Sequence, residues 1–382
     1  MQVYSWHLFP WPEIENRQEA EWPFERAPYD RERVRELYEE YFEQVEFTDQ
    51  EGWDGLILNE HHFSAYAMDP SPIVIASHLA SRTEHLDLSF LGNVVPVRGN
   101  PIRVAEELAV LDNLSGGRVI GGFARGIGIE YLAYNENRGP MGPGEDVSRD
   151  MFEEAIELIH KAWTAEDPFD WDGEFWQYEN VYIWPKPYQQ PRPPTWMPAT
   201  SEPSIRIAAK HELSLARQGE PAMVREGFET YERIAEEDYG WTPTEENRIM
   251  LNGIFVGEDS EKARESLTEH VRYHWEYLFG GVHRGAAARN AGDEHYDPET
   301  HRQNIAPHAI EFMDLDAEET VDGMLVGEPE EVVAQLERIY EAVGGFGHLA
   351  GTFQHGDAPQ EKTMRSLELF ADEVLPEIKK FG

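Results

Sequence analysis

The chain has 382 residues, of which 40% are hydrophobic and 12% aromatic, a composition that predicts a folded, enzyme-sized protein with a large core. The 74 Asp and Glu residues against 32 Lys and Arg give a formal net charge of −42. This charge excludes nucleic acid and anionic membranes as partners, because both bind through basic side chains. The absence of cysteine removes disulfides, thiolate zinc ligands and thiol catalysis, so redox chemistry must come from a cofactor.

The acidic residues are spread over amphipathic segments, such as 13–21, 36–46 and 328–331, and do not form a tail. This distribution favours a solvated, halophilic surface whose self-repulsion is screened by concentrated salt. No apolar run approaches the roughly 20 residues of a membrane helix, and the first residues carry no basic targeting region. We therefore expect a soluble, cytoplasmic protein.

Short β-rich runs alternate with longer amphipathic runs, which is typical of parallel strands joined by helices. The strands are predicted at 2–9, 55–59, 86–95, 118–124, 195–199, 213–216, 249–256 and 348–354. The helices are predicted at 30–51, 71–82, 101–114, 149–163, 204–210, 221–239, 260–278, 329–343 and 359–380. Eight alternations match an α/β fold of the (β/α)8 TIM-barrel type. Because no internal repeat or interdomain linker is visible, we expect one domain over residues 1–382.

Two stretches interrupt this alternation. Residues 169–194 are rich in Trp, Tyr and Pro, which predicts a β-hairpin followed by an extended return. Residues 280–315 contain Gly, Pro, His and Asp without periodicity. We interpret this second stretch as a long loop near the barrel mouth, because long loops in compact domains are often functional lids.

The segment from Asn59 to Phe63 reads Asn-Glu-His-His-Phe and follows the apolar run of the second strand. In a barrel, catalytic groups come from such carboxyl-terminal strand ends. Neighbouring residues of an extended chain point to opposite sides, so only one of His61 and His62 can face the cavity. Taken alone, the pair is more simply explained as hydrogen-bonded core histidines. A metal site is disfavoured, because three consecutive side chains do not easily converge on one ion.

The fourth predicted strand is preceded by two glycines, Gly116 and Gly117, which suit the positive φ of a helix end. It continues through Gly121-Gly122 and ends at Ala124-Arg125-Gly126. We interpret its small residues as room for a flat ring, and Arg125 as a phosphate ligand, with a structural ion pair as the alternative. The glycine spacing is not the dinucleotide-binding fingerprint.

Hydroxyl side chains follow the fifth predicted strand, at Thr200, Ser201 and Ser204. At a strand-to-helix junction such side chains can cap the helix. The same junction presents backbone N–H groups to a phosphate, which is common in barrels. The two interpretations are compatible.

Aromatic residues gather where the first strand ends. Trp6, His7 and Trp11 there, together with His62 and Trp196, are assigned to the wall of an apolar substrate pocket. Packing at the top of the barrel is the simpler alternative for the aromatics of the first strand, and His62 is expected to have a structural role as well.

Taken together, these segments resemble the bacterial luciferase-like family of flavin-dependent monooxygenases. The resemblance covers most of the chain, and its most specific part runs from Ala105-Glu106-Glu107 to Gly116-Gly117-Arg118. It resumes at residues 152–163, 253–258, 327–332 and 370–376. The region 280–315 shows no match and is where we expect specificity to differ.

The resemblance implies roles for individual positions. His61 matches the histidine that luciferases use near the flavin for oxygen chemistry and proton transfer, which makes it the candidate acid or base. Gly92 and Asn93 match the strand end that lies against the isoalloxazine ring. Light emission is not expected, because Ala124 stands where luciferase has a reactive cysteine.

The phosphate site is implied in the same way. Arg125, followed by Gly126, matches the arginine that holds the FMN phosphate, and Ser201 and Ser204 match hydroxyls on the same phosphate. Thr200 replaces a luciferase glutamate, so it departs from the family pattern at that contact.

The implied reaction uses reduced FMN, supplied by a separate flavin reductase, and O2 to oxygenate a small apolar substrate. The family also implies a homodimer. One alternative is a deazaflavin-dependent oxidoreductase on the same barrel, which moves hydride without oxygen. Another is a non-catalytic flavin-binding protein. No metal is expected.

Overall fold

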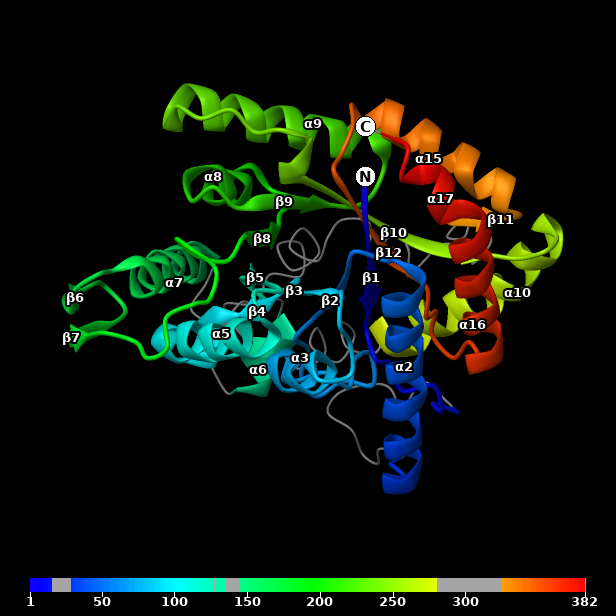
Figure 1. Ribbon diagram of the computed structural model, residues 1–382, viewed down its shortest axis with the longest axis horizontal. Helices are drawn as coiled ribbons and strands as arrows, with labels where there is room; N and C mark the ends of the chain where they lie inside the picture. The colour runs from blue at the N-terminus through cyan, green and yellow to red at the C-terminus, as the bar shows by residue number, and fades with distance from the viewer. Residues whose placement is uncertain (16–28, 127, 135–144, 280–323, 382) are drawn as a thin grey trace, which may run out of the picture.

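Eight parallel strands form a closed barrel at the centre of the computed structural model, which describes residues 1–15, 29–126, 128–134, 145–279 and 324–381 (Figure 1). Each strand pairs in parallel with the next, and the last pairs with the first. This confirms the predicted (β/α)8 fold. In order around the barrel the strands are β1 (Gln2–His7), β2 (Gly55–Leu58), β3 (Asp87–Phe90), β5 (Val119–Ala124), β8 (Thr195–Pro198), β9 (Ser214–Arg217), β10 (Arg248–Val256) and β12 (His348–Thr352).

Alternation along the strands separates an inner from an outer core. Inward-facing side chains fill the barrel with a small cluster that includes Tyr4, Ile57, Trp196 and Ile249. Their neighbours, such as Leu56, belong to the larger cluster under the helices. The barrel is therefore a packed core, and a ligand site must lie above it at a strand end.

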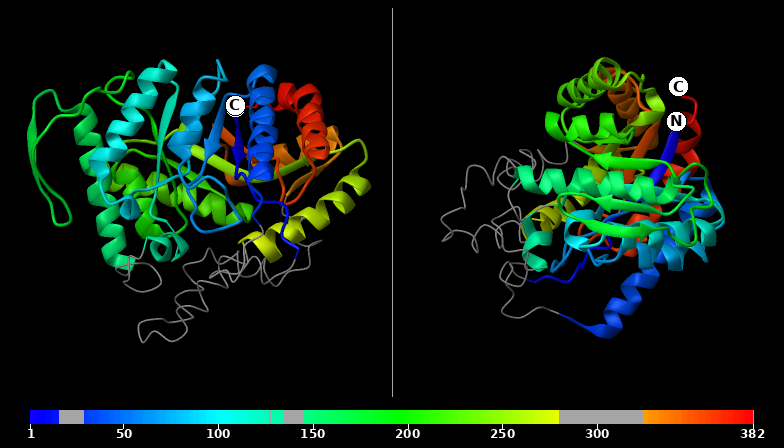
Figure 2. Two further views of the ribbon diagram at one scale, coloured as in Figure 1. Left: turned by 90° about the horizontal axis from the view of Figure 1, so that it is seen from below. Right: turned by 90° about the vertical axis from the view of Figure 1, so that its left-hand side faces the viewer.

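Helices surround the strands, as the three views of Figures 1 and 2 show. Asp30 accepts hydrogen bonds from two N–H groups of the first described helix, which ends at Gly52 with φ 89°. The helices are α2 (Arg31–Glu51), α3 (Pro72–Ala80), α4 (Val95–Arg98), α5 (Pro101–Ser115), α6 (Gly128–Ala133), α7 (Glu145–Thr164), α8 (Glu202–Lys210), α9 (Pro221–Ile234), α10 (Ser260–Tyr273), α15 (Pro329–Val343), α16 (Gln360–Leu369) and α17 (Leu375–Ile378).

Several predicted boundaries were wrong in detail. The strand predicted at 86–95 is split into β3 and the short β4 (Asn93–Val94), which pairs with β5. Three predicted helices change to wider π turns near their ends, at η1 (Ala235–Tyr239), η3 (His274–Phe279) and η4 (Phe370–Val374). The sequence also gave no indication of α4, α6, the 3-10 turn η2 (Glu245–Asn247) or β11 (Leu325–Gly327).

The predicted hairpin is confirmed. Strands β6 (Phe169–Asp172) and β7 (Gln177–Val181) pair antiparallel and project beyond α7, at the left of Figure 1. The predicted long loop at 280–315 lies outside the described residues.

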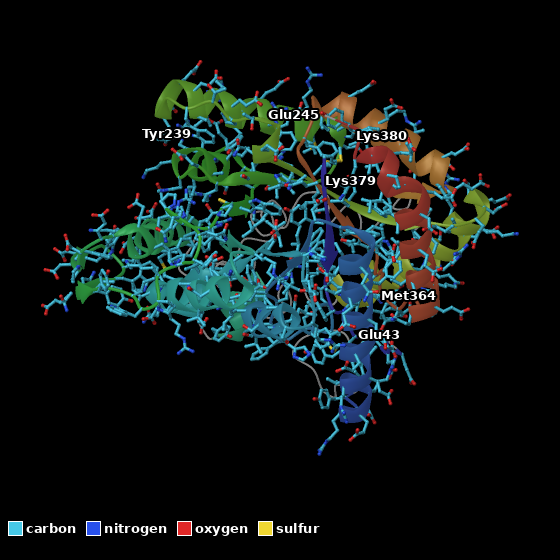
Figure 3. The ribbon with its side chains drawn as sticks, viewed as in Figure 1. Glu43, Tyr239, Glu245, Met364, Lys379 and Lys380 are labelled. Atoms are coloured by element: carbon cyan, nitrogen blue, oxygen red, sulfur yellow. The ribbon has the colours of Figure 1, made fainter. Side chains whose placement is uncertain are left out.

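The two ends of the chain meet at the amino-terminal side of the barrel. The Met1 ammonium donates to the Phe381 carbonyl at 3.1 Å. Lys379, labelled in Figure 3, donates to the Gly52 carbonyl at 2.7 Å and so ties the last helix to the end of α2. Among the described residues, no helix is both long and apolar enough to span a bilayer.

Candidate active site at the strand ends

The predicted cofactor residues follow adjacent strands. The barrel order β2, β3, β5, β8 places the segments after these strands side by side. Asn93 of β4 is in register with Phe123 of β5, and Gly122 of β5 with Trp196 of β8. His61, Gly92, Arg125 and Ser201 therefore come from one half of the barrel rim, as the sequence predicts for residues at carboxyl-terminal strand ends.

His61 pairs with a buried carboxylate. Its Nδ1 lies 2.9 Å from Oε1 of Glu130, whose side chain is 0% exposed, while the His61 side chain is 19% exposed. Because a carboxylate can only accept, Nδ1 is the donor. The Tyr66 ring meets the imidazole edge-on at a centroid distance of 4.8 Å. The ring is thus held on one edge and one face, and it remains partly accessible.

His62 points into the protein. It is 4% exposed, and its Nε2 lies 3.1 Å from Oε1 of the equally buried Glu60. The other Glu60 oxygen accepts from the Val94 N–H at 3.0 Å and from Arg98 Nε at 2.8 Å. Burial alone would raise the pKa of Glu60, but the hydrogen bond from His62 and the Arg98 charge hold it below its ordinary value. His62 therefore ties β2 to β4 and does not line the pocket to which the sequence assigned it.

Glycines let the strands after β2 approach closely. A Cβ on Gly92 would lie 2.6 Å from the Ala124 nitrogen, and one on Gly122 would lie 1.4 Å from the Phe90 carbonyl oxygen. The peptide between Leu91 and Gly92 is cis. Our interpretation of the small residues of β5 as room for a flat ring was wrong for Gly122, because backbone fills that space.

Asn93 is fully buried beside these glycines. Its Nδ2 donates to the Gly122 carbonyl at 3.0 Å, and its Oδ1 has no hydrogen-bond partner within the part of the chain that the structure describes. Asn59 Nδ2 and Ser89 Oγ are likewise buried without partners among the described residues. Unsatisfied buried polar atoms are costly, so three of them at adjacent strand ends indicate a place where a polar ligand or water completes the hydrogen bonds.

Arg125 lies just beyond the end of β5. Its Nη1 donates to the buried Ser148 hydroxyl of α7 at 3.3 Å, and its carbonyl accepts from Tyr131 at 2.7 Å. The side chain is half-buried. Gly126 has φ 87°, and a Cβ there would lie 2.4 Å from Val94 Cγ1. The arginine is therefore anchored while its chain passes close to β4.

The hydroxyls after β8 do not cap α8. Ser201 is the N-cap residue, yet its side chain makes no capping hydrogen bond and instead lies 3.1 Å from the Ser204 hydroxyl. Thr200 and Ser201 are exposed and Ser204 is half-buried. The first N–H groups of a helix have no partners within it. This junction consequently presents hydroxyls and N–H groups on the strand next to the one that carries Arg125.

The residues predicted to line an aromatic pocket lie in different surroundings. Trp6 faces the barrel interior, is half-buried and donates to Asn59 Oδ1 at 2.8 Å. His7, the next residue, faces outward, and its Nε2 lies 2.9 Å from Gln44 of α2. The Phe9 N–H donates to the other ring nitrogen. Burial lowers the pKa of His7 to about 4, so this residue is a neutral core histidine.

The two remaining tryptophans are also buried. Trp196 is 2% exposed and packs inside the barrel against Tyr4 and His348, below the rim. Trp11 is 5% exposed, and its carbonyl accepts from Tyr273 of α10. Of the five predicted pocket residues, only Trp6 remains partly open on the inner face.

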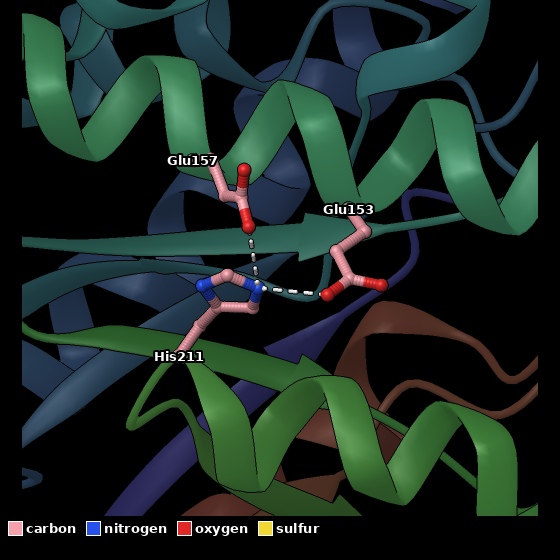
Figure 4. Close-up of side chains that lie close together, drawn as sticks. All are labelled: Glu153, Glu157 and His211. Carbon is pink, nitrogen blue, oxygen red and sulfur yellow. Dashed lines mark hydrogen bonds and ion pairs between the residues drawn. The ribbon is translucent and has the colours of Figure 1, made fainter.

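A second cluster, made of glutamate and histidine side chains, lies away from the strand ends. Glu153 and Glu157 of α7 point toward His211, which follows α8 (Figure 4). His211 Nε2 is 3.4 Å from Glu153 and 3.9 Å from Glu157. Lys210 Nζ contacts the same two carboxylates at 2.5 and 3.0 Å. The Lys210 ammonium already offsets part of the negative charge of the two carboxylates, so we interpret the cluster as a link between α7 and α8.

Sequence reasoning missed Glu130. It lies on a six-residue helix with no apolar periodicity to reveal it. The available signal was its place shortly after the Arg125 strand end, where side chains reach the rim.

A family model described as luciferase-like monooxygenase matches residues 23–345. The chain belongs to this family. The oxygenase component of a flavin-dependent trigonelline monooxygenase from Acinetobacter baylyi is 28% identical over 357 residues, covering 91% of each chain. The protein is thus a flavin-dependent monooxygenase, an enzyme that incorporates oxygen from O2 into its substrate.

Solved structures share the fold. The oxygenating constituent of 3,6-diketocamphane monooxygenase from Pseudomonas putida, a type II Baeyer-Villiger monooxygenase in complex with FMN, has a TM-score of 0.75 and 21% identity, covering 99% of this chain and 98% of that one. An F420-dependent secondary alcohol dehydrogenase in complex with an F420–acetone adduct has a TM-score of 0.66 and 18% identity, covering 99% and 98%. At these identities the likeness shows the barrel alone.

Proposed function

We propose that the protein uses reduced FMN and O2 to oxygenate a small, apolar organic substrate. The observation that carries the choice of cofactor is the pairing of an anchored arginine with an uncapped helix. Arg125 follows β5 and Ser201 begins α8 after β8, and these two strands are neighbours. A guanidinium near a helix N-terminus that carries serine hydroxyls is suited to a terminal phosphate such as that of FMN.

The residues at the strand ends fit the rest of the flavin. The ring edge of a flavin offers both hydrogen-bond donors and acceptors. Asn59 Nδ2, Ser89 Oγ and Asn93 Oδ1 are buried polar atoms without partners among the described residues, and together they supply a donor, a hydroxyl and an acceptor. Bound there, the reduced flavin supplies the electrons that activate O2. Trp6 and the apolar barrel interior below it exclude water from that side.

His61 is the proposed acid or base. The exposed edge of its imidazole carries Nε2, which makes no hydrogen bond to the described residues, so it can hold or release a proton at the substrate. We also propose a separate flavin reductase as partner, because the trigonelline relative is described as an oxygenase component. A homodimer remains part of the proposal.

The phosphate contact is tested by comparing FMN with riboflavin, which lacks the phosphate. Under anaerobic conditions, Arg125→Ala should weaken binding of reduced FMN by about 10- to 100-fold, the value of one charged hydrogen-bonding group. Binding of reduced riboflavin should not change. Arg103→Ala removes an exposed arginine of α5 and is the control. Equal losses for FMN and riboflavin would show that Arg125 acts on the fold and not on the phosphate.

The alternative cofactor is a deazaflavin, which moves hydride without oxygen. It shares this barrel in the F420-dependent dehydrogenase, but the relative that aligns over 91% of the chain is a flavin-dependent monooxygenase. Oxygen uptake with reduced FMN, and none with reduced deazaflavin, is the expected result. Hydride transfer from the deazaflavin to an oxidised substrate under nitrogen would reverse the assignment.

A further inference from the structure

We propose that Glu130 is a positioning residue that fixes the tautomer and the charge of His61, so that Nε2 is the nitrogen that exchanges protons at the active site. This inference rests on the proposed role of His61. It adds a residue from a different segment of the chain, the short helix α6 after β5.

The hydrogen bond to Glu130 decides which ring nitrogen of His61 carries the proton. His61 Nδ1 and Glu130 Oε1 are 2.9 Å apart, and the Glu130 side chain is 0% exposed. In water a neutral histidine exchanges its single ring proton between the two nitrogens. A buried carboxylate at Nδ1 can only accept, so it selects the Nδ1–H form and leaves a lone pair on Nε2.

Packing around His61 opposes rotation of its ring. Tyr66 meets the imidazole edge-on at 4.8 Å, and Tyr66 is itself packed by His274 at 5.4 Å and Phe279 at 5.3 Å. Rotation of the His61 ring would break the Glu130 contact and open this packing. The ring therefore presents the same edge throughout a reaction cycle.

The negative charge of Glu130 also favours a positive charge on His61. When Nε2 takes up a proton the ring becomes an imidazolium, and the carboxylate of Glu130 stabilises that charge across a short hydrogen bond. The proton that His61 gains at Nε2 is the one that it later returns.

Other ionisable groups around the ring are few or already engaged. His62 and Glu60 bind each other on the opposite side of the chain. Burial lowers the pKa of His274 to about 3, so this histidine is neutral at working pH. Asp69 is fully buried, and burial raises its pKa well above the ordinary value. Of the described residues, Glu130 is thus the carboxylate that contacts His61 directly; the phenol of Tyr66, which packs against the same ring, stays neutral because burial raises its pKa.

The conservative variant separates charge from position. Glu130→Gln keeps an acceptor for Nδ1–H but removes the charge, whereas Glu130→Ala removes both. We expect Glu130→Gln to lower kcat about 10-fold with KM unchanged, and to shift the acidic limb of the kcat–pH profile to lower pH. Glu130→Ala should lower kcat further. Glu106→Gln, an exposed glutamate of α5, is the matched control and should leave kcat and its pH profile as they are.

The second measurement needs neither cofactor nor turnover. In protein with 15N-labelled histidine, the His61 signals, assigned by their loss in His61→Asn, should show a protonated Nδ1 and an unprotonated Nε2. Glu130→Ala should move the proton to Nε2 for most molecules. A wild-type ring protonated at Nε2 in its neutral form, or an unchanged tautomer in Glu130→Ala, would overturn the proposal.

A double-mutant comparison tells the two proposals apart. If His61→Ala leaves turnover unchanged, the proposed role of His61 fails. If His61→Ala lowers turnover but Glu130→Gln does not, the role of His61 stands and the positioning by Glu130 is refuted. In a His61→Ala background, Glu130→Gln should cause no further loss, because its effect passes through the ring.

Discussion

Two neighbouring glycines of β5 should respond very differently to the same added methyl group. A Cβ on Gly122 would lie 1.4 Å from the Phe90 carbonyl oxygen and 2.3 Å from its carbon, whereas a Cβ on Gly121 would meet Trp163 Cη2 at 3.1 Å and Thr195 Cγ2 at 3.2 Å. The first contact is with backbone, so relief requires β3 and β5 to separate by about 2 Å out of the roughly 4.8 Å that separates paired strands. The second is with side chains that can shift.

We therefore expect Gly122→Ala to cost more than about 4 kcal/mol of unfolding free energy, and Gly121→Ala about 1–2 kcal/mol. Each alanine also stabilises the protein by restricting the unfolded chain, but this effect is the same in both variants and does not change the difference between them. Urea unfolding in molar KCl measures the difference. Because Asn93 pairs with Phe123 next to Gly122, the first variant should also lose flavin binding. Equal free energies for the two variants would refute the claim that backbone contact, and not ring space, requires Gly122.

Two further predictions concern charge. Burial raises the pKa of Asp87 to about 6, although a hydrogen bond from Tyr4 at 3.2 Å acts in the opposite direction. The folded protein therefore disfavours the ionised carboxylate, and stability is lost as the pH rises from about 4 through 6. In urea titrations at several pH values, Asp87→Asn should increase the free energy of unfolding by about 2 kcal/mol at pH 8 and by progressively less below pH 6. With a net charge of −42, the melting temperature should rise steeply from dilute buffer to molar KCl; a flat profile would contradict a halophilic surface.

The barrel was predictable because the sequence shows short β-rich runs alternating with longer amphipathic runs. All eight strands were placed, and Gly52 and Gly116 end their helices at φ 89° and 72° with the left-handed conformation that glycine accepts readily. The breaks within predicted segments were not visible. The split at Leu91–Gly92 and the π turns after α9 and α10 depend on how neighbouring elements pack, and no local pattern encodes that.

The sequence indicated where the candidate residues lie along the barrel rim, but not which way their side chains point. His61 and Arg125 follow strands, so their place at the rim follows from the fold. Which way a side chain points depends on the register of its strand. Trp6 and His7 are adjacent in sequence, yet Trp6 faces Asn59 inside the barrel and His7 faces Gln44 outside it. Glu130 was not predicted for another reason. It lies 69 residues from its partner His61, and no rule of sequence spacing connects the two.

The acidic surface and the proposed anionic cofactor repel each other over long distances, whereas the proposed binding contacts act over short ones. The net charge of −42 repels an approaching phosphate over the Debye length, about 10 Å in 0.1 M salt but about 3 Å in 1 M salt. The proposed contacts to Arg125 and to the N–H groups of α8 would act at hydrogen-bond distance, where screening is weak. Concentrated salt therefore removes the long-range repulsion and leaves the local attraction. We therefore expect the concentrated salt that is predicted to stabilise the surface also to let a phosphate reach the anchored Arg125 guanidinium at the end of β5.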